Sequence, residues 1–174
     1  MAIILDAAYF AAPATVLAPA LLGKIICCRQ ADGSVKRARI TETECYFGEQ
    51  DTACHASHGR TPRTDTLYLP GGAAYVYLCY GIHRLFNVVT GPADHPEAVL
   101  LRGVEGAVGP GRATKYLGIS LSHNRAPLTP ESGLWLEDDG AIPEYTTAPR
   151  VGIGYASEED QARLWRYTIK HAIR

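Results

Sequence analysis

The sequence contains no apolar run near the ~20 residues that a helix needs to cross a bilayer, so we expect no membrane span. The first twenty residues hold neither Lys nor Arg, whereas a secretory signal begins with positive charge. The five cysteines are odd in number and include no Cys-x-x-Cys pair, which argues against a disulfide framework. We therefore expect a cytoplasmic protein with reduced thiols.

A strong charge of either sign is also missing. The chain has 17 Lys and Arg against 18 Asp and Glu, a net charge of −1 at pH 7, so bulk charge does not indicate a nucleic-acid ligand. The charges are unevenly placed, however. Residues 1–130 hold 12 basic and 10 acidic side chains, and residues 163–174 hold four basic and no acidic ones. This distribution permits a local basic face.

A chain of 174 residues with 47% hydrophobic and 20% charged residues suits one globular domain over residues 1–174. Residue patterns and turn signals predict several strands and a few short helices. The strands are 24–30, 35–47, 73–80, 85–90, 98–104, 134–137 and 150–155, and the helices are 15–22, 109–117 and one that begins at Ser157. Asp32 and Gly33 indicate a hairpin between the first two strands. These elements predict an α+β fold on a mostly antiparallel sheet.

Two glutamates share one face of the expected strand 35–47. Glu42 and Glu44 lie two residues apart, so their side chains point the same way, and Tyr46 extends the row. Such a row is usually a solvated polar edge. Here apolar residues and a cysteine surround the pair, and the strand leads into the polar loop 48–65. A carboxylate in this position is well placed to act as a general base.

The same polar loop contains Cys54, His55 and His58. These residues could be metal ligands, but a structural zinc site needs four ligands, and no second pair follows at a suitable spacing. We therefore expect no metal. His55 is more consistent with an exposed loop histidine, or with a ring that stacks and forms hydrogen bonds.

Tyrosines gather in the segment 75–81. Tyr75 and Tyr77 share one strand face, and Tyr80 precedes Gly81, where the strand should turn. This pattern fits a half-buried aromatic strand. It also fits a platform for an extruded base, with Tyr80 as a wedge that fills the gap left in a duplex.

Two further polar residues interrupt apolar strands. Arg102 closes the hydrophobic run 98–101, where it is either a strand end that reaches solvent or a partner for a carboxylate or phosphate. Asn87 lies within the apolar run 85–89, and a buried amide must find hydrogen-bond partners. Asn87 is therefore either a structural polar group or a group that sets specificity.

Together these residues resemble the alkyladenine (3-methyladenine) DNA glycosylases, a single-domain family that removes alkylated and deaminated purines. The resemblance runs over residues 9–167, nearly the whole chain. It rests on blocks that occur in the family's order: Leu22 and Gly23, 41–46, 53–55, 75–77 with Tyr80 and Gly81, Asn87, 99–102, Gly109 and Pro110, and 150–152. The resemblance implies a curved, mostly antiparallel sheet with short surrounding helices and a protruding β-hairpin.

The resemblance also implies roles for the residues around the reacting sugar and the base. Glu44 would be the general base that activates a water molecule, and Arg102 and the main-chain carbonyl of Val151 would help to hold that water. Tyr46 and His55 would stack on one side of the flipped base.

Three other roles follow from the same resemblance. Tyr77 would stack on the opposite side of the base, and Tyr80 would be the wedge in the duplex. Asn87 would crowd the 2-amino group of guanine and so discourage attack on normal guanine. The backbone N–H of His55 would contact the purine edge at the 6-position.

The implied function is that of a monofunctional glycosylase of base excision repair. It would flip 3-methyladenine, 7-methylguanine, hypoxanthine or ethenoadenine out of double-stranded DNA and hydrolyse the N-glycosidic bond. Segment 44–102 has no lysine, so no Schiff-base nucleophile is indicated. We expect a monomer without cofactor. Two alternatives are a non-catalytic module that binds damaged DNA and a metal-dependent hydrolase that uses Cys54, His55 and His58.

Overall fold

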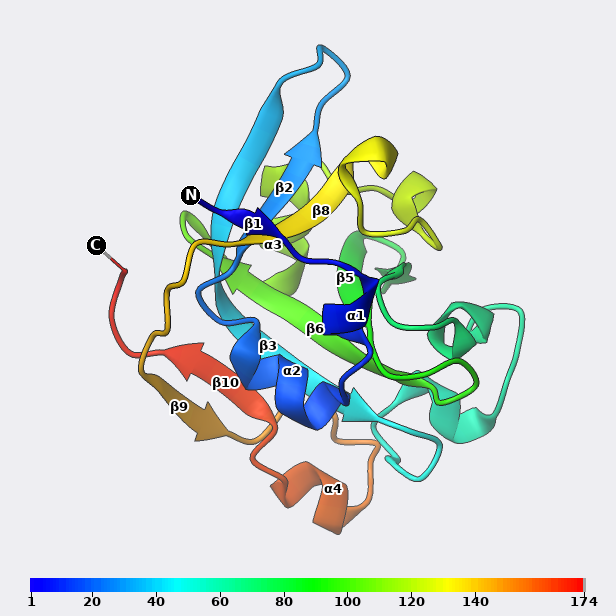
Figure 1. Ribbon diagram of the computed structural model, residues 1–174. Coiled ribbons are helices and arrows are strands. Elements are labelled where there is room, and N and C mark those ends of the chain that lie inside the picture. Colours follow the sequence, from blue (N-terminus) through cyan, green and yellow to red (C-terminus); the bar gives the residue numbers. More distant parts are fainter. Residues whose placement is uncertain (174) are drawn as a thin grey trace.

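Ten antiparallel strands form one connected sheet in the computed structural model, which describes residues 1–173 (Figure 1). Arg174, the last cation of segment 163–174, lies outside the described residues. The strands are β1 (Ile3–Ile4), β2 (Ile25–Arg29), β3 (Val35–Phe47), β4 (Ala74–Cys79), β5 (His83–Val89), β6 (Glu97–Val104), β7 (Ala107–Val108), β8 (Leu134–Asp138), β9 (Tyr145–Ala148) and β10 (Arg166–Ile169). The α-helices are α1 (Ala7–Phe10), α2 (Ala14–Ala20), α3 (Pro110–Leu117) and α4 (Glu158–Ala162). The predicted α+β class and mostly antiparallel sheet are confirmed.

The long strand β3 changes partners along its length. From Val35 to Arg39 it pairs with β2, and from Ile40 onward it pairs with β6, while β10 pairs with residues 42–44. The register between β3 and β6 shifts on both sides of Glu42, and such irregularities bend a strand. The β2–β3 hairpin projects beyond the rest of the molecule at the top of Figure 1. Its turn contains Gly33 with φ of +85°, a backbone conformation that glycine adopts readily.

Side-chain alternation gives the central strands two different faces. Phe86 of β5 and Leu101 of β6 belong to the main hydrophobic cluster. Their neighbours Asn87 and Arg102 line cavities instead, because successive side chains of a strand point to opposite faces. The strands that build the core therefore also present the polar groups of a site.

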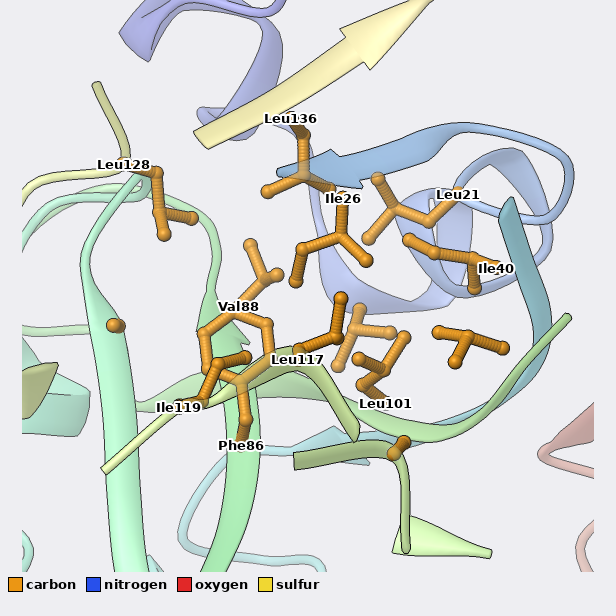
Figure 2. Close-up of a cluster of buried hydrophobic side chains, with 14 of the residues drawn as sticks. Leu21, Ile26, Ile40, Phe86, Val88, Leu101, Leu117, Ile119, Leu128 and Leu136 are labelled. Carbon is orange, nitrogen blue, oxygen red and sulfur yellow. The ribbon is translucent and has the colours of Figure 1, made fainter. Parts of the chain in front are cut away.

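The main hydrophobic core lies where helices α2 and α3 contact β3, β5 and β6. Figure 2 shows its central side chains, which come from elements far apart in the sequence: Leu21, Ile26, Ile40, Phe86, Val88, Leu101, Leu117, Ile119, Leu128 and Leu136. Fully burying one side chain of this kind contributes roughly 1.5–3 kcal/mol. This core holds the site-bearing strands in a fixed relation to one another.

The predicted strand at 150–155 is wrong. These residues form turns, and Gly152 has φ of +73°, which lies outside the extended region of the backbone map. The sheet gains β9 and β10 on either side of this segment instead, and neither was predicted. Among residues 1–173, no helix is long and apolar enough to cross a membrane.

Candidate active site

Two adjoining cavities bring together all eight residues that the resemblance singles out. The larger cavity, of about 700 Å³, is lined by seven of them: Glu44, Tyr46, His55, Tyr77, Tyr80, Arg102 and Val151. The smaller one, of about 40 Å³, is lined by Asn87 and shares Tyr46, His55 and Tyr77 with the first. Residues that are up to 107 positions apart in sequence therefore face one connected space.

Glu44 lies on β3 at the larger cavity, and its side chain is fully buried. Its Oε1 accepts a hydrogen bond from the Tyr46 hydroxyl at 2.9 Å. Its Oε2 accepts one from the backbone N–H of Val151 at 2.7 Å. Burial raises the pKa of the Glu44 carboxyl, and the nearby Arg102, the Val151 N–H and the Tyr46 hydroxyl each oppose that rise. The carboxyl is thus oriented by two donors, yet keeps lone pairs for a third partner.

Arg102 lies on β6 between two glutamates. Its Nε is 3.2 Å from Glu42 Oε1 and 3.8 Å from Glu44 Oε2. The same Glu42 oxygen is 3.4 Å from Nη1 of Arg166 on β10. Glu42, which the sequence indicated only as the neighbour of Glu44, therefore orients Arg102 and connects the site to β10.

The aromatic side chains form the wall that the two cavities share. The rings of His55 and Tyr77 are 4.6 Å apart between centroids and meet edge to face. The Tyr75 hydroxyl lies 2.9 Å from His55 Nδ1. With this geometry the rings touch, so a base that stacks between His55 and Tyr77 must first separate them.

The imidazole of His55 is uncharged at neutral pH. Burial, followed by the nearby Arg63 and His58, lowers the pKa of His55 to about 4. A neutral ring can stack on a positively charged base without the repulsion that an imidazolium would impose. The Tyr77 ring also forms a cation–π contact with Arg63, whose guanidinium carbon lies 5.3 Å from the ring centroid.

Asn87 is buried on β5 beneath the smaller cavity. Its Nδ2 donates to the Tyr75 carbonyl at 3.2 Å, so its side chain is held in one orientation. It is therefore a satisfied buried amide that also lines a cavity, and a role in specificity stays a prediction.

Tyr80 is at the tip of the β4–β5 hairpin and is 90% exposed. Its φ is +51°, and that of Gly81 is +68°. A non-glycine residue in this region costs about 1–2 kcal/mol, and such strain is often found at functional positions. Ile82, beside it, is also exposed. The tip therefore presents Tyr80 and Ile82 to solvent, and Tyr80 also lines the larger cavity.

A buried ion pair that the sequence did not indicate anchors the loop with Val151. Both Nη atoms of Arg150 donate to the Asp51 carboxylate, at 2.7 and 3.0 Å. Neither side chain is more than 1% exposed. The Arg150 guanidinium also lies 5.0 Å from the Tyr46 ring centroid. One arginine thus supports a cavity-wall tyrosine and fixes the backbone that donates to Glu44.

Cations without carboxylate partners also face the larger cavity. Arg63 and Arg112 both line it, and the ion pairs within residues 1–173 include neither of them. Unpaired arginines beside an exposed apolar tip favour an anionic, partly apolar ligand. The larger cavity is therefore locally positive at Arg63 and Arg112, although the net charge of the whole chain is close to zero.

The predicted alternative of a metal centre gains no support from this geometry. In the described part of the chain, no three His, Cys, Asp or Glu side chains are grouped so that they could hold a metal ion. Cys54 is buried in an apolar cluster, and this burial raises the pKa of its thiol to about 12. The Cys54 thiol therefore belongs to the hydrophobic interior.

Comparisons with known proteins cover nearly the whole chain. The family model of methylpurine-DNA glycosylase matches residues 8–108 and 104–173. A protein of Psychrobacter cryohalolentis is 43% identical over 90% of this chain and 86% of its own length. A Rickettsia felis protein is 38% identical over 99% and 96% of the two lengths, and one of Myxococcus xanthus is 41% identical over 96% and 92%. All three are provisionally named 3-methyladenine DNA glycosylases.

Proposed function

The chain belongs to the methylpurine-DNA glycosylase family, and we propose that it flips damaged purines out of duplex DNA and hydrolyses their N-glycosidic bond with water activated by Glu44. The family makes the protein a DNA-repair hydrolase of N-glycosyl bonds. The observation that carries the finer proposal is the fully buried Glu44, which lies in the same cavity as the aromatic wall and the exposed Tyr80.

The hydrolysis needs a base and an anionic group close to the sugar. The water oxygen forms a bond to C1′ while one water proton passes to the Glu44 carboxylate. The C1′–N9 bond breaks, and its electron pair leaves with the purine. A cationic alkylated purine becomes neutral in this way, whereas a neutral purine leaves as an anion and then takes up a proton from solvent. As the sugar gains positive charge, the same carboxylate faces it and lowers the energy of the transition state. Arg102 and the Val151 N–H favour the ionised form of the carboxylate against the effect of burial, and the N–H also orients it.

Recognition of the damaged base combines stacking with the ease of flipping. Unstacking and unpairing a base costs a few kcal/mol, and a damaged or mispaired base costs less than a normal one. Tyr80 occupies the space that the base leaves in the duplex, and Arg63 and Arg112 are available for the backbone phosphates. Electron-poor, cationic purines gain most from the faces of Tyr46 and Tyr77.

Release of the base leaves the DNA strand intact, so the enzyme is monofunctional. No lysine within the described residues lines either cavity, and a Schiff base needs an amine nucleophile. We expect the enzyme to act as a monomer. Action on bacterial chromosomal DNA suits the expected cytoplasmic location.

Excision from a panel of duplexes tests this function. Each duplex carries one 3-methyladenine, 7-methylguanine, hypoxanthine or ethenoadenine, and an undamaged duplex is the control. We expect abasic sites at damaged purines only, with strand breaks appearing only after alkali treatment. Breaks without alkali would contradict the monofunctional mechanism, and equal action on the undamaged duplex would contradict the proposed specificity.

Tyr46→Phe should move the acidic limb of the pH profile of kcat/KM to higher pH. Glu44 must be ionised to accept a proton, so activity falls as the pH drops through its pKa. The Tyr46 hydroxyl lowers that pKa, so its removal lets the pKa rise further. Tyr77→Phe removes a phenol from the same cavity and should leave the limb in place. An acidic limb at the same pH in wild type and Tyr46→Phe would refute the coupling of Tyr46 to Glu44.

Asn87→Ser should raise excision of purines that carry a 2-amino group, relative to hypoxanthine, by about 10-fold, because a smaller side chain relieves the steric exclusion. The rates are measured under single-turnover conditions with 7-methylguanine and hypoxanthine duplexes. Asn124→Ser is the matched control, because Asn124 accepts from the Val76 N–H and lines neither cavity. An unchanged preference in Asn87→Ser would count against the role of Asn87 in excluding guanine.

A further inference from the structure

Tyr155 lines both cavities, although no sequence pattern singles it out. It is 66% exposed, so its ring borders the opening rather than the floor. Its hydroxyl donates to the Ala53 carbonyl at 2.8 Å, and Ala53 also lines the smaller cavity. The Tyr155 hydroxyl therefore lies next to a residue of the smaller cavity.

The backbone that carries Tyr155 is fixed, while its side chain has room to turn. Ile153 and Ala156, on either side of it, pack with Ala53 in a small buried cluster. The ion pair between Arg150 and Asp51 anchors the start of the same loop. Because the ring is largely exposed, its hydroxyl can leave the Ala53 carbonyl without loss of this packing.

We propose that the Tyr155 hydroxyl turns from the Ala53 carbonyl to a flipped purine and donates a hydrogen bond that speeds the departure of neutral bases. This inference rests on the proposed glycosylase function and adds a specificity residue to it. No proton is transferred in this step, since the hydroxyl hydrogen stays on Tyr155 throughout.

The effect should depend on the charge of the leaving base. A neutral purine such as hypoxanthine departs with the electron pair of the C1′–N9 bond and develops negative charge on its ring nitrogens and carbonyl oxygen. A donor aimed at those atoms stabilises that charge in the transition state. An alkylated purine is already cationic, becomes neutral as it leaves, and gains little from the same donor.

Tyr155 can supply this donor at the pH of the reaction. Burial raises the pKa of the Tyr155 phenol. Arg150 opposes this rise, and the acidic neighbours Asp51 and Glu44 add to it. The hydroxyl therefore keeps its hydrogen well above neutral pH. The hydroxyls of Tyr46 and Tyr75 are bonded to the side chains of Glu44 and His55, whereas the Tyr155 hydroxyl is bonded only to a backbone carbonyl that it can release.

Tyr155→Phe tests the inference, because it keeps the ring and removes only the hydroxyl. Single-turnover excision is measured on hypoxanthine and 7-methylguanine duplexes, and thermal melting confirms that the variant is folded. We expect the excision rate to fall about 10-fold for hypoxanthine, which corresponds to the loss of one hydrogen bond in the transition state. The rate for 7-methylguanine should fall less than about twofold. Tyr116→Phe, on α3 and outside both cavities, is the matched control.

The other outcomes separate this inference from the proposed function. Equal losses on both duplexes would indicate a structural role and overturn the inference, as would no loss on either. Wild-type protein that excises 7-methylguanine but not hypoxanthine would overturn the role of Tyr155 and leave the glycosylase function intact. Wild-type protein that excises neither base, nor any other lesion, would overturn both.

Discussion

Glu44→Gln should lower the rate of base excision by about 10³-fold while binding of lesion-containing duplexes persists. The amide has nearly the size of the carboxylate, and its oxygen can still accept from the Val151 N–H. It cannot accept a proton from water, and it carries no charge to face the developing positive charge on the sugar. The excision rate is measured in a single turnover on a hypoxanthine duplex, and the dissociation constant is measured at one fixed salt concentration.

Glu105→Gln is the matched control for this experiment. Glu105 is an exposed glutamate in the turn between β6 and β7, so its change removes the same charge without touching either cavity. We expect wild-type rates from it. A Glu44→Gln rate within about threefold of wild type would show that another group activates the water.

Arg150→Met should destabilise the protein by about 3–5 kcal/mol, because it leaves the Asp51 carboxylate buried without its partner. For a chain of this length, a loss of that size lowers Tm by roughly 6–20 °C. Arg150 also donates to the Cys45 carbonyl at 3.0 Å, so the change removes a further contact between the 150–156 loop and β3. The measurement is reversible thermal or urea unfolding followed by circular dichroism.

Lys170→Met provides the comparison for Arg150→Met. The ion pair of Lys170 with Glu144 joins side chains that are 44% and 79% exposed, and exposed pairs contribute about 1 kcal/mol or less. Its loss should therefore lower Tm by only a few degrees. Equal effects of the two substitutions would mean that the buried pair does not anchor the loop.

The sequence predicted those parts of the fold whose signals are local. Strand 35–47 has the same bounds in the structure, because its β-rich pattern runs unbroken between Gly33 and Gly48. The strand predicted at 150–155 does not form, because a tertiary contact determines the backbone there. Arg150 turns inward to meet Asp51, 99 residues away, and Gly152 then takes a positive φ. Nothing in the local pattern distinguishes such a segment from a short strand.

The sequence indicated the site residues individually, but not the contacts that join them. The Glu-x-Glu-x-Tyr row placed Glu44 and Tyr46 on one face, and the structure adds the hydrogen bond between them. The resemblance implies a role for the Val151 carbonyl, whereas in the structure the Val151 N–H donates to Glu44. Tyr155 has no sequence signal at all, because its importance comes from its position at two cavities formed by distant segments.

The most direct test of the central claim is release of free hypoxanthine from a duplex by the purified wild-type protein in EDTA, measured by mass spectrometry beside an adenine duplex. We expect free hypoxanthine in an amount equal to the abasic sites, and no adenine from the control. No free base from hypoxanthine or from any alkylated purine, with binding retained, would contradict catalysis and point to a module that only binds damaged DNA. Release that occurs only without EDTA would instead indicate a metal-dependent hydrolase.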